Sequence, residues 1–257
     1  MLPPPPKAHG LLDGKVTLVT AAAGAGIGWA TARRCAEEGA VVVLSDRHER
    51  RLAAAAEALS EVTGVRPLAV PCDVTSEPQV LALFDAVAEA HGRLDVVVNN
   101  AGLGGTAELA GMTDEQWHAV LDVTLTGTMR CTRAALRQMY GQGSGVIVNN
   151  ASVVGWRAQR GQAHYAAAKA GVMALTRCVA LEAAEHGVRV NAVAPSLAVH
   201  PFLAKVTGEE LLAELAAREA FGRSAEPWEV ANVIVFLASD YSSYMTGEVV
   251  SVSSQHP

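Results

Sequence analysis

The sequence lacks a long hydrophobic run, a secretion-signal pattern and any excess of positive charge. No apolar stretch reaches the ~18–20 residues that a helix needs to span a bilayer, and the first residues lack the charged-then-apolar order of a signal peptide. A formal net charge of −6 gives no general attraction to nucleic acid or to an acidic membrane. We therefore expect a cytoplasmic protein that contacts neither and acts on a small-molecule substrate.

Patterns for metal binding, disulfides and serine hydrolysis are also missing. The eight histidines form no HExxH motif or His-rich cluster, so no metal site is predicted. The absence of a GxSxG nucleophile turn argues against a serine hydrolase. The cysteines show no CxxC spacing and lie in apolar periodic segments, where a free cysteine behaves as a small hydrophobe. All four are predicted to be buried, reduced thiols: Cys35, Cys72, Cys131 and Cys178.

What the sequence does contain is enough apolar residues for one large domain. Half of the 257 residues are hydrophobic and 18% are charged, which favours a single domain over residues 11–257. A proline-rich arm at 1–10 precedes it, with prolines 3–6 favouring an extended polyproline II segment. This arm is expected to be either disordered or packed against the domain.

Short β-branched runs alternate with helical patterns along the chain, and the most apolar runs read as strands covered on both faces. This order predicts an α/β fold: a Rossmann-like, doubly wound parallel sheet of about seven strands with helices on both faces. A segment at about 196–226 breaks the rhythm and is interpreted as a substrate lid. Strands are predicted at 15–20, 40–45, 66–73, 94–100, 145–152, 188–195 and 248–253, and helices at 27–38, 49–61, 77–91, 114–140, 162–186, 209–219 and 227–238.

The turn after the first predicted strand is rich in glycine. "TAAAGAGIGWATARR" (20–34) places Gly24, Gly26 and Gly28 where a helix begins, and such a turn can bring its backbone close to a pyrophosphate. The alternative interpretation, without a ligand, is a tight turn whose glycines adopt positive φ. Asp46 ends the second predicted strand, positioned for ribose hydroxyls, and favours NAD because a carboxylate repels a 2′-phosphate. The following basic residues, Arg47 among them, could instead neutralise that phosphate, so NADP remains the alternative.

A tyrosine and a lysine lie one helical turn apart in "YAAAK" (165–169). Residues i and i+4 share a helix face, about 5–6 Å apart at Cβ. A cation about 5 Å from a phenol, at an effective dielectric of about 20, contributes roughly 3 kcal/mol. We therefore expect Lys169 to lower the pKa of Tyr165 enough for proton exchange near neutral pH.

With "NNAG" (99–102) and Ser152 thirteen residues before Tyr165, residues 12–252 resemble the classical short-chain dehydrogenase/reductases. Within this family, the chain looks most like actinobacterial members that act in steroid ring degradation. The resemblance implies hydride transfer between a nicotinamide cofactor and a secondary alcohol or ketone, with a bulky apolar, steroid-derived or acyl-CoA-type substrate. The alternatives are a catalytically impaired NAD-binding sensor or scaffold and a 3-oxoacyl thioester reductase that uses NADPH. The implied catalytic residues are Ser152, Tyr165 and Lys169, and the implied cofactor residues are Gly24, Gly26, Ile27, Gly28, Asp46, Arg47, Asp73, Val74, Asn99, Ala101, Gly102, Pro195 and Ser196.

The sequence departs from this family's pattern at several positions. Thr124 stands where the family usually has an asparagine that completes a catalytic tetrad through a water, so its role is open. Ala21 and Ser196 replace customary glycines. The sensor hypothesis rests on Thr124 and Ser196.

The resemblance also implies a homotetramer built through the helices at 114–140 and 162–186. Substrate-pocket residues are harder to assign, because each could equally belong to the core. The set expected to line the pocket is Leu103, Val154, Trp156, Gln162, Leu197 and Phe202.

Overall fold

The computed structural model describes residues 3–199 and 208–254. Its centre is a seven-stranded sheet in the order β3-β2-β1-β4-β5-β6-β7, in which every neighbouring pair is parallel. The predicted seven-stranded, Rossmann-like sheet is thereby confirmed. The strands are β1 (Val16–Thr20), β2 (Val41–Asp46), β3 (Leu68–Pro71), β4 (Val96–Asn99), β5 (Gly145–Asn150), β6 (Val188–Pro195) and β7 (Val249–Val252).

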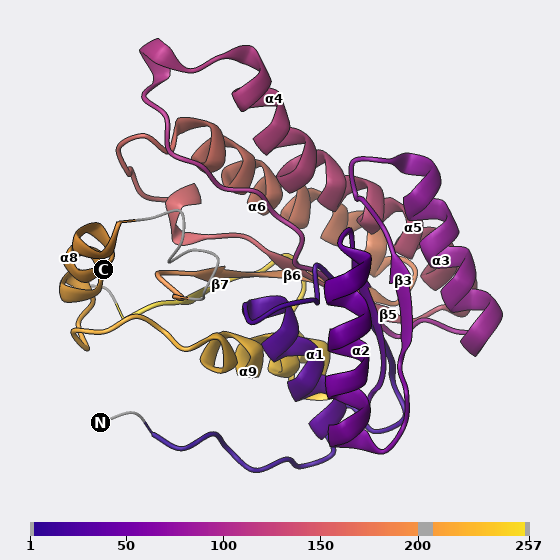
Figure 1. Ribbon diagram of the computed structural model, residues 1–257. Coiled ribbons are helices and arrows are strands. Elements are labelled where there is room, and N and C mark those ends of the chain that lie inside the picture. The colour runs from indigo at the N-terminus through magenta and orange to yellow at the C-terminus, as the bar shows by residue number, and fades with distance from the viewer. Residues whose placement is uncertain (1–2, 200–207, 255–257) are drawn as a thin grey trace.

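Helices cover both faces of the sheet (Figure 1). One apolar layer joins the sheet to α1 (Ile27–Glu37), α2 (Glu49–Thr63) and α9 (Pro227–Ala238). The opposite layer contains α3 (Glu77–His91), α5 (Gly127–Gln142) and α6 (Ala163–Ala184). Because parallel strands are covered on both sides, their polar ends meet only at the sheet edge, and that edge is where ligands of such sheets bind. The remaining helical segments are η1 (Leu109–Gly111), α4 (Asp114–Leu121), η2 (Asp122–Thr126), η3 (Val153–Gly155), α8 (Glu209–Arg218) and η4 (Asp240–Ser242).

The helix predicted at 114–140 is interrupted by a π-helical turn. α4 starts with a capping box between Thr113 and Gln116 and runs into η2, which leads directly into α5. Gly127, the first residue of α5, lies so close to Val74 that a Cβ there would stand 2.6 Å from the valine side chain. A π turn inserts one residue into the helical ladder and is frequent at functional sites. Here it contains Thr124.

The cysteine prediction is correct for three residues and wrong for the fourth. Cys35, Cys72 and Cys131 are buried, and burial raises the pKa of each thiol. Cys178 is a free, exposed thiol on α6. The sequence of α6 is apolar nearly all round, so its periodicity does not tell which stripe faces the sheet.

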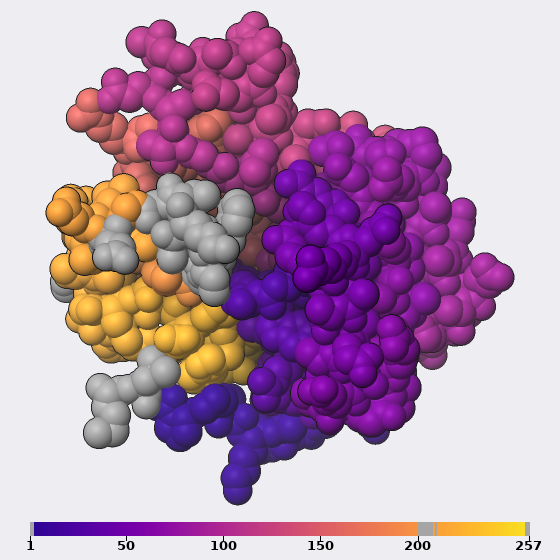
Figure 2. Space-filling view, viewed as in Figure 1, coloured from indigo at the N-terminus to yellow at the C-terminus, as the bar shows by residue number. Residues whose placement is uncertain are grey.

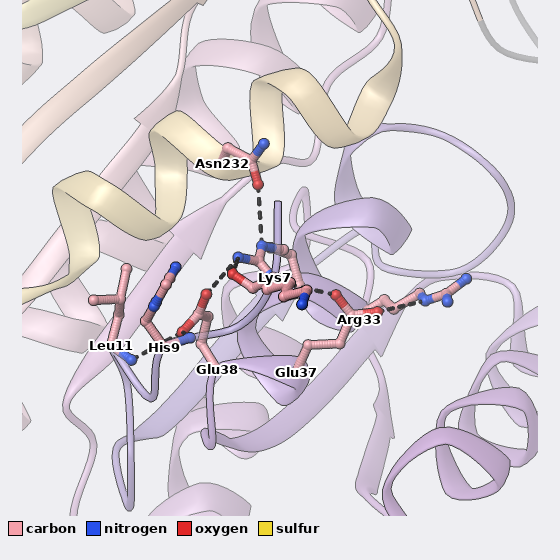
Figure 3. A network of polar contacts seen from close by, with 8 residues as sticks. Lys7, His9, Leu11, Arg33, Glu37, Glu38 and Asn232 are labelled. Carbon is pink, nitrogen blue, oxygen red and sulfur yellow. Dashed lines mark hydrogen bonds and ion pairs between the residues drawn. The ribbon is translucent and has the colours of Figure 1, made fainter. Parts of the chain in front are cut away.

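The proline-rich arm is packed against the domain at its carboxyl end (Figure 3). The backbone N–H groups of His9 and Leu11 each donate to Glu38 Oε2 at 2.9 Å. Arg34 pairs with the other carboxylate oxygen of Glu38 and donates to Lys7 O at 3.3 Å and to Asn232 Oδ1 at 3.0 Å. Residues 3–10 are exposed and lie along the lower edge of the molecule (Figure 2).

Within the described ranges, no helix combines the length and apolar character that crossing a membrane requires.

Candidate active site

The glycine-rich turn follows β1 and opens α1. Gly24 has φ 111°, and no atom of the described residues lies within 4 Å of the place where its Cβ would stand. Gly26 is the N-cap of α1, no side chain from the described part of the chain caps that end, and the first turn contains no acidic residue. The N–H groups at the start of this 11-residue helix are therefore available to an anion. This open backbone cradle fits the pyrophosphate of a dinucleotide, with Ile27 as the first helical residue.

Gly28 is tightly packed. A Cβ at this position would stand 2.2 Å from Ala21 O and 2.4 Å from Asn100 Nδ2. Ala21, which replaces a customary glycine, adopts φ 49° and is the one non-glycine residue with positive φ in the described part of the chain. Gly28 thus lets α1 approach the turn. The turn keeps its left-handed residue although alanine replaces glycine at position 21.

Asp46 ends β2 and contacts the same turn. Its carboxylate accepts the His48 N–H at 2.9 Å and the Ala23 N–H at 3.3 Å, and Arg51 Nη2 lies 3.9 Å away. Burial raises the pKa of Asp46 more than these hydrogen bonds and the nearby arginines lower it. Arg47 is exposed and lines a shallow surface hollow with the next four residues, 48–51.

Asp73 and Val74 follow β3. Asp73 Oδ1 accepts the N–H and the hydroxyl of Thr75 at 2.9 and 2.8 Å. Burial acts to raise the pKa of Asp73, but these hydrogen bonds and the charges of Arg47 and Arg130 hold it below its ordinary value. Val74 is buried against Gly127 at the start of α5.

The carboxyl ends of β4 and β5 carry paired asparagines. Asn99 is buried, and its amide donates to Thr132 Oγ1 at 3.0 Å and to Asn149 Oδ1 at 2.9 Å, so its side chain belongs to the interior of the sheet. Asn100 reaches the glycine turn instead, because its Nδ2 donates to Ala21 O at 3.2 Å. Sequence reasoning missed Asn100 and Asn150. The repeated "NN" at the ends of two neighbouring strands, in register at Asn99 and Asn149, was the available signal.

Ser152, Tyr165 and Lys169 meet beyond β5. Ser152 Oγ accepts the Val154 N–H at 3.3 Å and lies 3.5 Å from Pro195 O at the end of β6. Lys169 is buried, donates from Nζ to Asn150 O at 2.5 Å and lies 5.5 Å from the Tyr165 ring centroid. Ala101 and Gly102 precede the loop opposite, where a Cβ on Gly102 would lie 3.6 Å from Lys169 Nζ.

In the protein chain itself, Lys169 does not lower the pKa of Tyr165 as expected. Although Tyr165 keeps part of its surface exposed, the surrounding protein removes water from the phenol and raises its pKa to about 12. Hydrogen bonding with Ser152 lowers that pKa by less. The same burial lowers the pKa of Lys169 to about 8. Desolvation by the whole surroundings therefore exceeds the effect of one neighbouring charge.

Thr124 lies close to the lysine but is bonded elsewhere. Its buried hydroxyl donates to Leu103 O at 3.1 Å and accepts the Leu103 N–H at 3.0 Å. A Cβ on Gly102 would stand 3.8 Å from Thr124 Oγ1 and 3.6 Å from Lys169 Nζ, so this glycine lies near both side chains.

The residues expected to line the substrate pocket divide into three groups. Leu103, Val154 and Leu197 are partly buried, and Trp156 is 50% exposed. Gln162 Nε2 donates to Gly105 O at 2.8 Å and to Thr106 Oγ1 at 3.2 Å, which ties the loop after β4 to the start of α6. Ser196, which belongs to the expected cofactor residues and not to the pocket set, donates its backbone N–H to Val252 O at 3.1 Å. Phe202 and the rest of 200–207 lie outside the described residues. Within the expected lid at 196–226, the Ala225 N–H donates to Leu197 O at 2.8 Å.

Among the residues that the structure describes, no group of three or more His, Cys, Asp or Glu side chains could hold a metal ion.

Comparison with known proteins places this geometry in a family. A family model described as enoyl-(acyl carrier protein) reductase matches residues 21–254. A Mycobacterium tuberculosis protein named (5R,7aS)-5-hydroxy-7a-methyl-1-oxo-2,3,5,6,7,7a-hexahydro-1H-indene-carboxyl-CoA reductase is 66% identical over 97% of this chain and 95% of its own length. The cis-4-hydroxycyclohexanecarboxylate dehydrogenase of Sinomonas cyclohexanicum is 45% identical over 93% and 94%. A crystal structure of a short chain dehydrogenase from Mycobacterium smegmatis superposes with a TM-score of 0.90 at 61% identity, covering 100% of this chain and 99% of that one.

Proposed function

Because the chain belongs to the short-chain dehydrogenase/reductase family and is an oxidoreductase acting between a nicotinamide cofactor and an alcohol or ketone, we propose that Ser152, Tyr165 and Lys169 carry its reaction. The supporting observation is that these three side chains meet at one edge of the sheet, beyond β5 and next to the end of β6. The chemistry supplied by a bound nicotinamide is hydride transfer to or from the carbinol carbon.

Each of the three residues has a distinct part in the proposal. The Ser152 hydroxyl hydrogen-bonds the substrate oxygen and holds it against the phenol. Tyr165 gives its proton to that oxygen during reduction and recovers one during oxidation. Lys169, held by Asn150 O, keeps a donor beside the phenol. With its pKa raised to about 12 by burial, the Tyr165 phenol of the free protein carries the proton that reduction of a ketone consumes.

The cofactor is proposed to be held by the turn and by the strand ends that the sequence singled out. Gly24, Gly26 and the first turn of α1 take the pyrophosphate, whereas Asp46 lies where a ribose hydroxyl would be recognised. Asp46 supports NAD, since its carboxylate would repel a 2′-phosphate. The hollow lined by Arg47 and its neighbours supports NADP as the alternative.

The substrate is proposed to be a coenzyme A thioester of a fused-ring keto or hydroxy acid, of the kind produced in steroid breakdown. Support comes from the relative at 66% identity, whose name specifies a hexahydroindene carboxyl-CoA. The apolar residues Val154 and Trp156, which follow Ser152 closely in the chain, and Leu197, which follows β6, agree with a bulky ring system. The segment 196–226 is proposed to cover such a substrate.

We further propose that the protein works in the cytoplasm as a homotetramer. The exposed face of α6 supports the assembly, since it presents small apolar residues and Leu181, which is 77% exposed. Light scattering on the purified protein tests it, and a monomer at micromolar concentration would reject the assembly.

Absorbance at the reduced-nicotinamide band tests the function. We expect wild-type protein to oxidise NADH with a bicyclic keto acyl-CoA and to turn over the matching free acid or a straight-chain 3-oxoacyl thioester less well. Tyr165→Phe should lose about 10²–10⁴ in kcat, the range typical of general acid–base groups, while still binding NADH. Undiminished turnover by Tyr165→Phe would reject the assignment. Tight NADH binding with no turnover across the ketone and alcohol panel would favour the sensor hypothesis.

A further inference from the structure

A line of hydrogen bonds connects the glycine turn with the catalytic lysine. Asn100 Nδ2 donates to Ala21 O at 3.2 Å, and Asn100 Oδ1 accepts from Asn150 Nδ2 at 2.9 Å. The backbone oxygen of Asn150 then accepts from Lys169 Nζ at 2.5 Å. The line crosses the carboxyl ends of the adjacent strands β1, β4 and β5 and ends on α6.

At the turn, the line holds a residue in an unfavourable conformation. Ala21 has φ 49°, a left-handed conformation that is unfavourable for alanine because its Cβ crowds the following carbonyl oxygen. The bond from Asn100 to Ala21 O opposes relaxation of this conformation. Asn100 is itself fixed, because its N–H donates to Thr20 Oγ1 at 3.0 Å. Gly28 leaves no space for movement, since Ala21 O and Asn100 Nδ2 occupy the place of its missing Cβ.

At the other end, the position of the lysine depends on Asn150. Lys169 is only 3% exposed, and the hydrogen bond that the structure records for its Nζ goes to Asn150 O. Asn150 is the last residue of β5, paired in register with Val193 of β6. The Asn150 side chain therefore ties the strand end that bears this carbonyl to Asn100.

Asn150 is a costly residue for this place if packing is its only role. Its Oδ1 is buried and has no hydrogen-bond partner among the described residues, and leaving a buried acceptor unsatisfied is unfavourable. An aliphatic side chain would avoid that cost. What the amide adds is the donor that reaches Asn100.

We infer that Asn150 is a positioning residue that fixes Lys169 relative to the glycine turn through Asn100. It touches neither substrate nor reacting atoms. Asn150 thereby keeps a fixed distance between the two ends of the dinucleotide site, which are the pyrophosphate turn and the Tyr165–Lys169 pair. The inference rests on the proposed function, which supplies the dinucleotide.

Substitution of Asn150 by leucine tests the inference. For Asn150→Leu we expect the NADH Kd, measured by tryptophan fluorescence without substrate, to rise about 5–10-fold and kcat to fall about 10-fold. The substrate KM should stay within about 2-fold, because the substrate wall is untouched. In a double-mutant cycle, Asn100→Leu and Asn150→Leu should be non-additive in NADH Kd, because both break one connection.

Asn232→Leu is the matched control. Asn232 is also a half-buried asparagine in a side-chain hydrogen bond, with Arg34 Nε at 3.0 Å, but it lies on α9 away from the site. It should lower the melting temperature and leave NADH Kd and kcat unchanged. Asn150→Ser serves if the leucine variant does not fold, with the same expected shifts.

A folded Asn150 variant whose NADH Kd and kcat both match wild type overturns this inference alone. Additive effects in the cycle overturn it as well, because the two asparagines would then act separately. Wild-type protein that binds neither NADH nor NADPH overturns the proposed function, and this inference with it.

Discussion

Thr124 Oγ1 is bonded on both sides by the backbone of Leu103: it donates to the carbonyl at 3.1 Å and accepts the N–H at 3.0 Å. A hydroxyl has a single proton to donate, and this one is used by the carbonyl. Thr124 thus anchors the loop after β4, which lies against Tyr165. A Cβ on Gly104 in that loop would stand 3.9 Å from the tyrosine ring.

We expect Thr124→Val to raise the substrate KM about 10-fold while kcat changes less than about 3-fold, because removing both bonds loosens a binding wall and uniform binding is what KM reports. Steady-state kinetics at saturating NADH measure the split. Thr132→Val is the control, since that hydroxyl bonds Asn99 inside the sheet. A fall in kcat with KM unchanged would instead assign Thr124 to proton transfer.

Lys169→Met should stabilise the protein while abolishing turnover. Burial lowers the Lys169 pKa from 10.5 to about 8, which corresponds to about 3 kcal/mol of destabilisation when the lysine is charged. Losing the bond to Asn150 O offsets about 1 kcal/mol of that. At pH 7 the variant should therefore be more stable by about 2 kcal/mol in denaturant unfolding.

The sign of the pH dependence follows from the lowered pKa. Between pH 8 and 10.5 the unfolded chain binds a proton at Lys169 that the folded chain does not, so wild-type stability rises with pH in this window. The extra stability of Lys169→Met over wild type should be largest below pH 8 and should decrease toward pH 10.5. Lys7→Met, which removes an exposed ammonium group, is the control. A constant difference across the range would contradict the lowered pKa.

Asp46→Asn tests the cofactor preference. The amide can still accept the Ala23 N–H but no longer repels a phosphate, so the NADPH Kd should fall at least about 10-fold while the NADH Kd changes less than about 3-fold. Fluorescence titrations with both nucleotides measure the two constants. Asp13→Asn, an exposed site, removes the same charge elsewhere. Wild-type protein that already binds NADPH as tightly as NADH would refute the NAD preference.

Glu38→Gln should release the N-terminal arm and destabilise the fold. Breaking a buried ion pair by removing one partner costs about 3–5 kcal/mol, and Arg34 would keep its charge. Unfolding in denaturant measures the loss, and trypsin cleavage after Lys7 should accelerate. Deleting residues 3–6, which are exposed, should do neither.

At acidic pH, the difference in free energy of unfolding between wild type and Glu38→Gln should become smaller. Burial acts to raise the pKa of Glu38, but the N–H groups of Leu11 and His9 and the charge of Arg34 hold it below its ordinary 4.5. Its contribution is therefore present above pH 4.5 and disappears as pH falls through the lowered value. A difference that persists at pH 2 would show that the carboxylate charge is not what holds the arm.

Much of this architecture was predictable from local patterns. β-branched runs and glycine turns located all seven strands, because both faces of a parallel strand must be apolar and its end must turn. The spacing in "YAAAK" was enough to place Tyr165 and Lys169 together, since helical geometry puts i and i+4 on one face. Cys178 was misplaced because α6 is apolar on nearly every side.

Other properties depended on contacts between segments far apart in the chain. The pKa of Tyr165 rises because packing removes its water, which no neighbour within the helix discloses. The hydroxyl of Thr124 is engaged by Leu103, 21 residues away, and Asn100 and Asn150 meet across 50 residues. Periodicity and spacing report which elements form and which face of each is apolar, because both depend on near neighbours. Burial and hydrogen-bond partners arise only when the assembled layers exclude water, and they set the chemistry of the site.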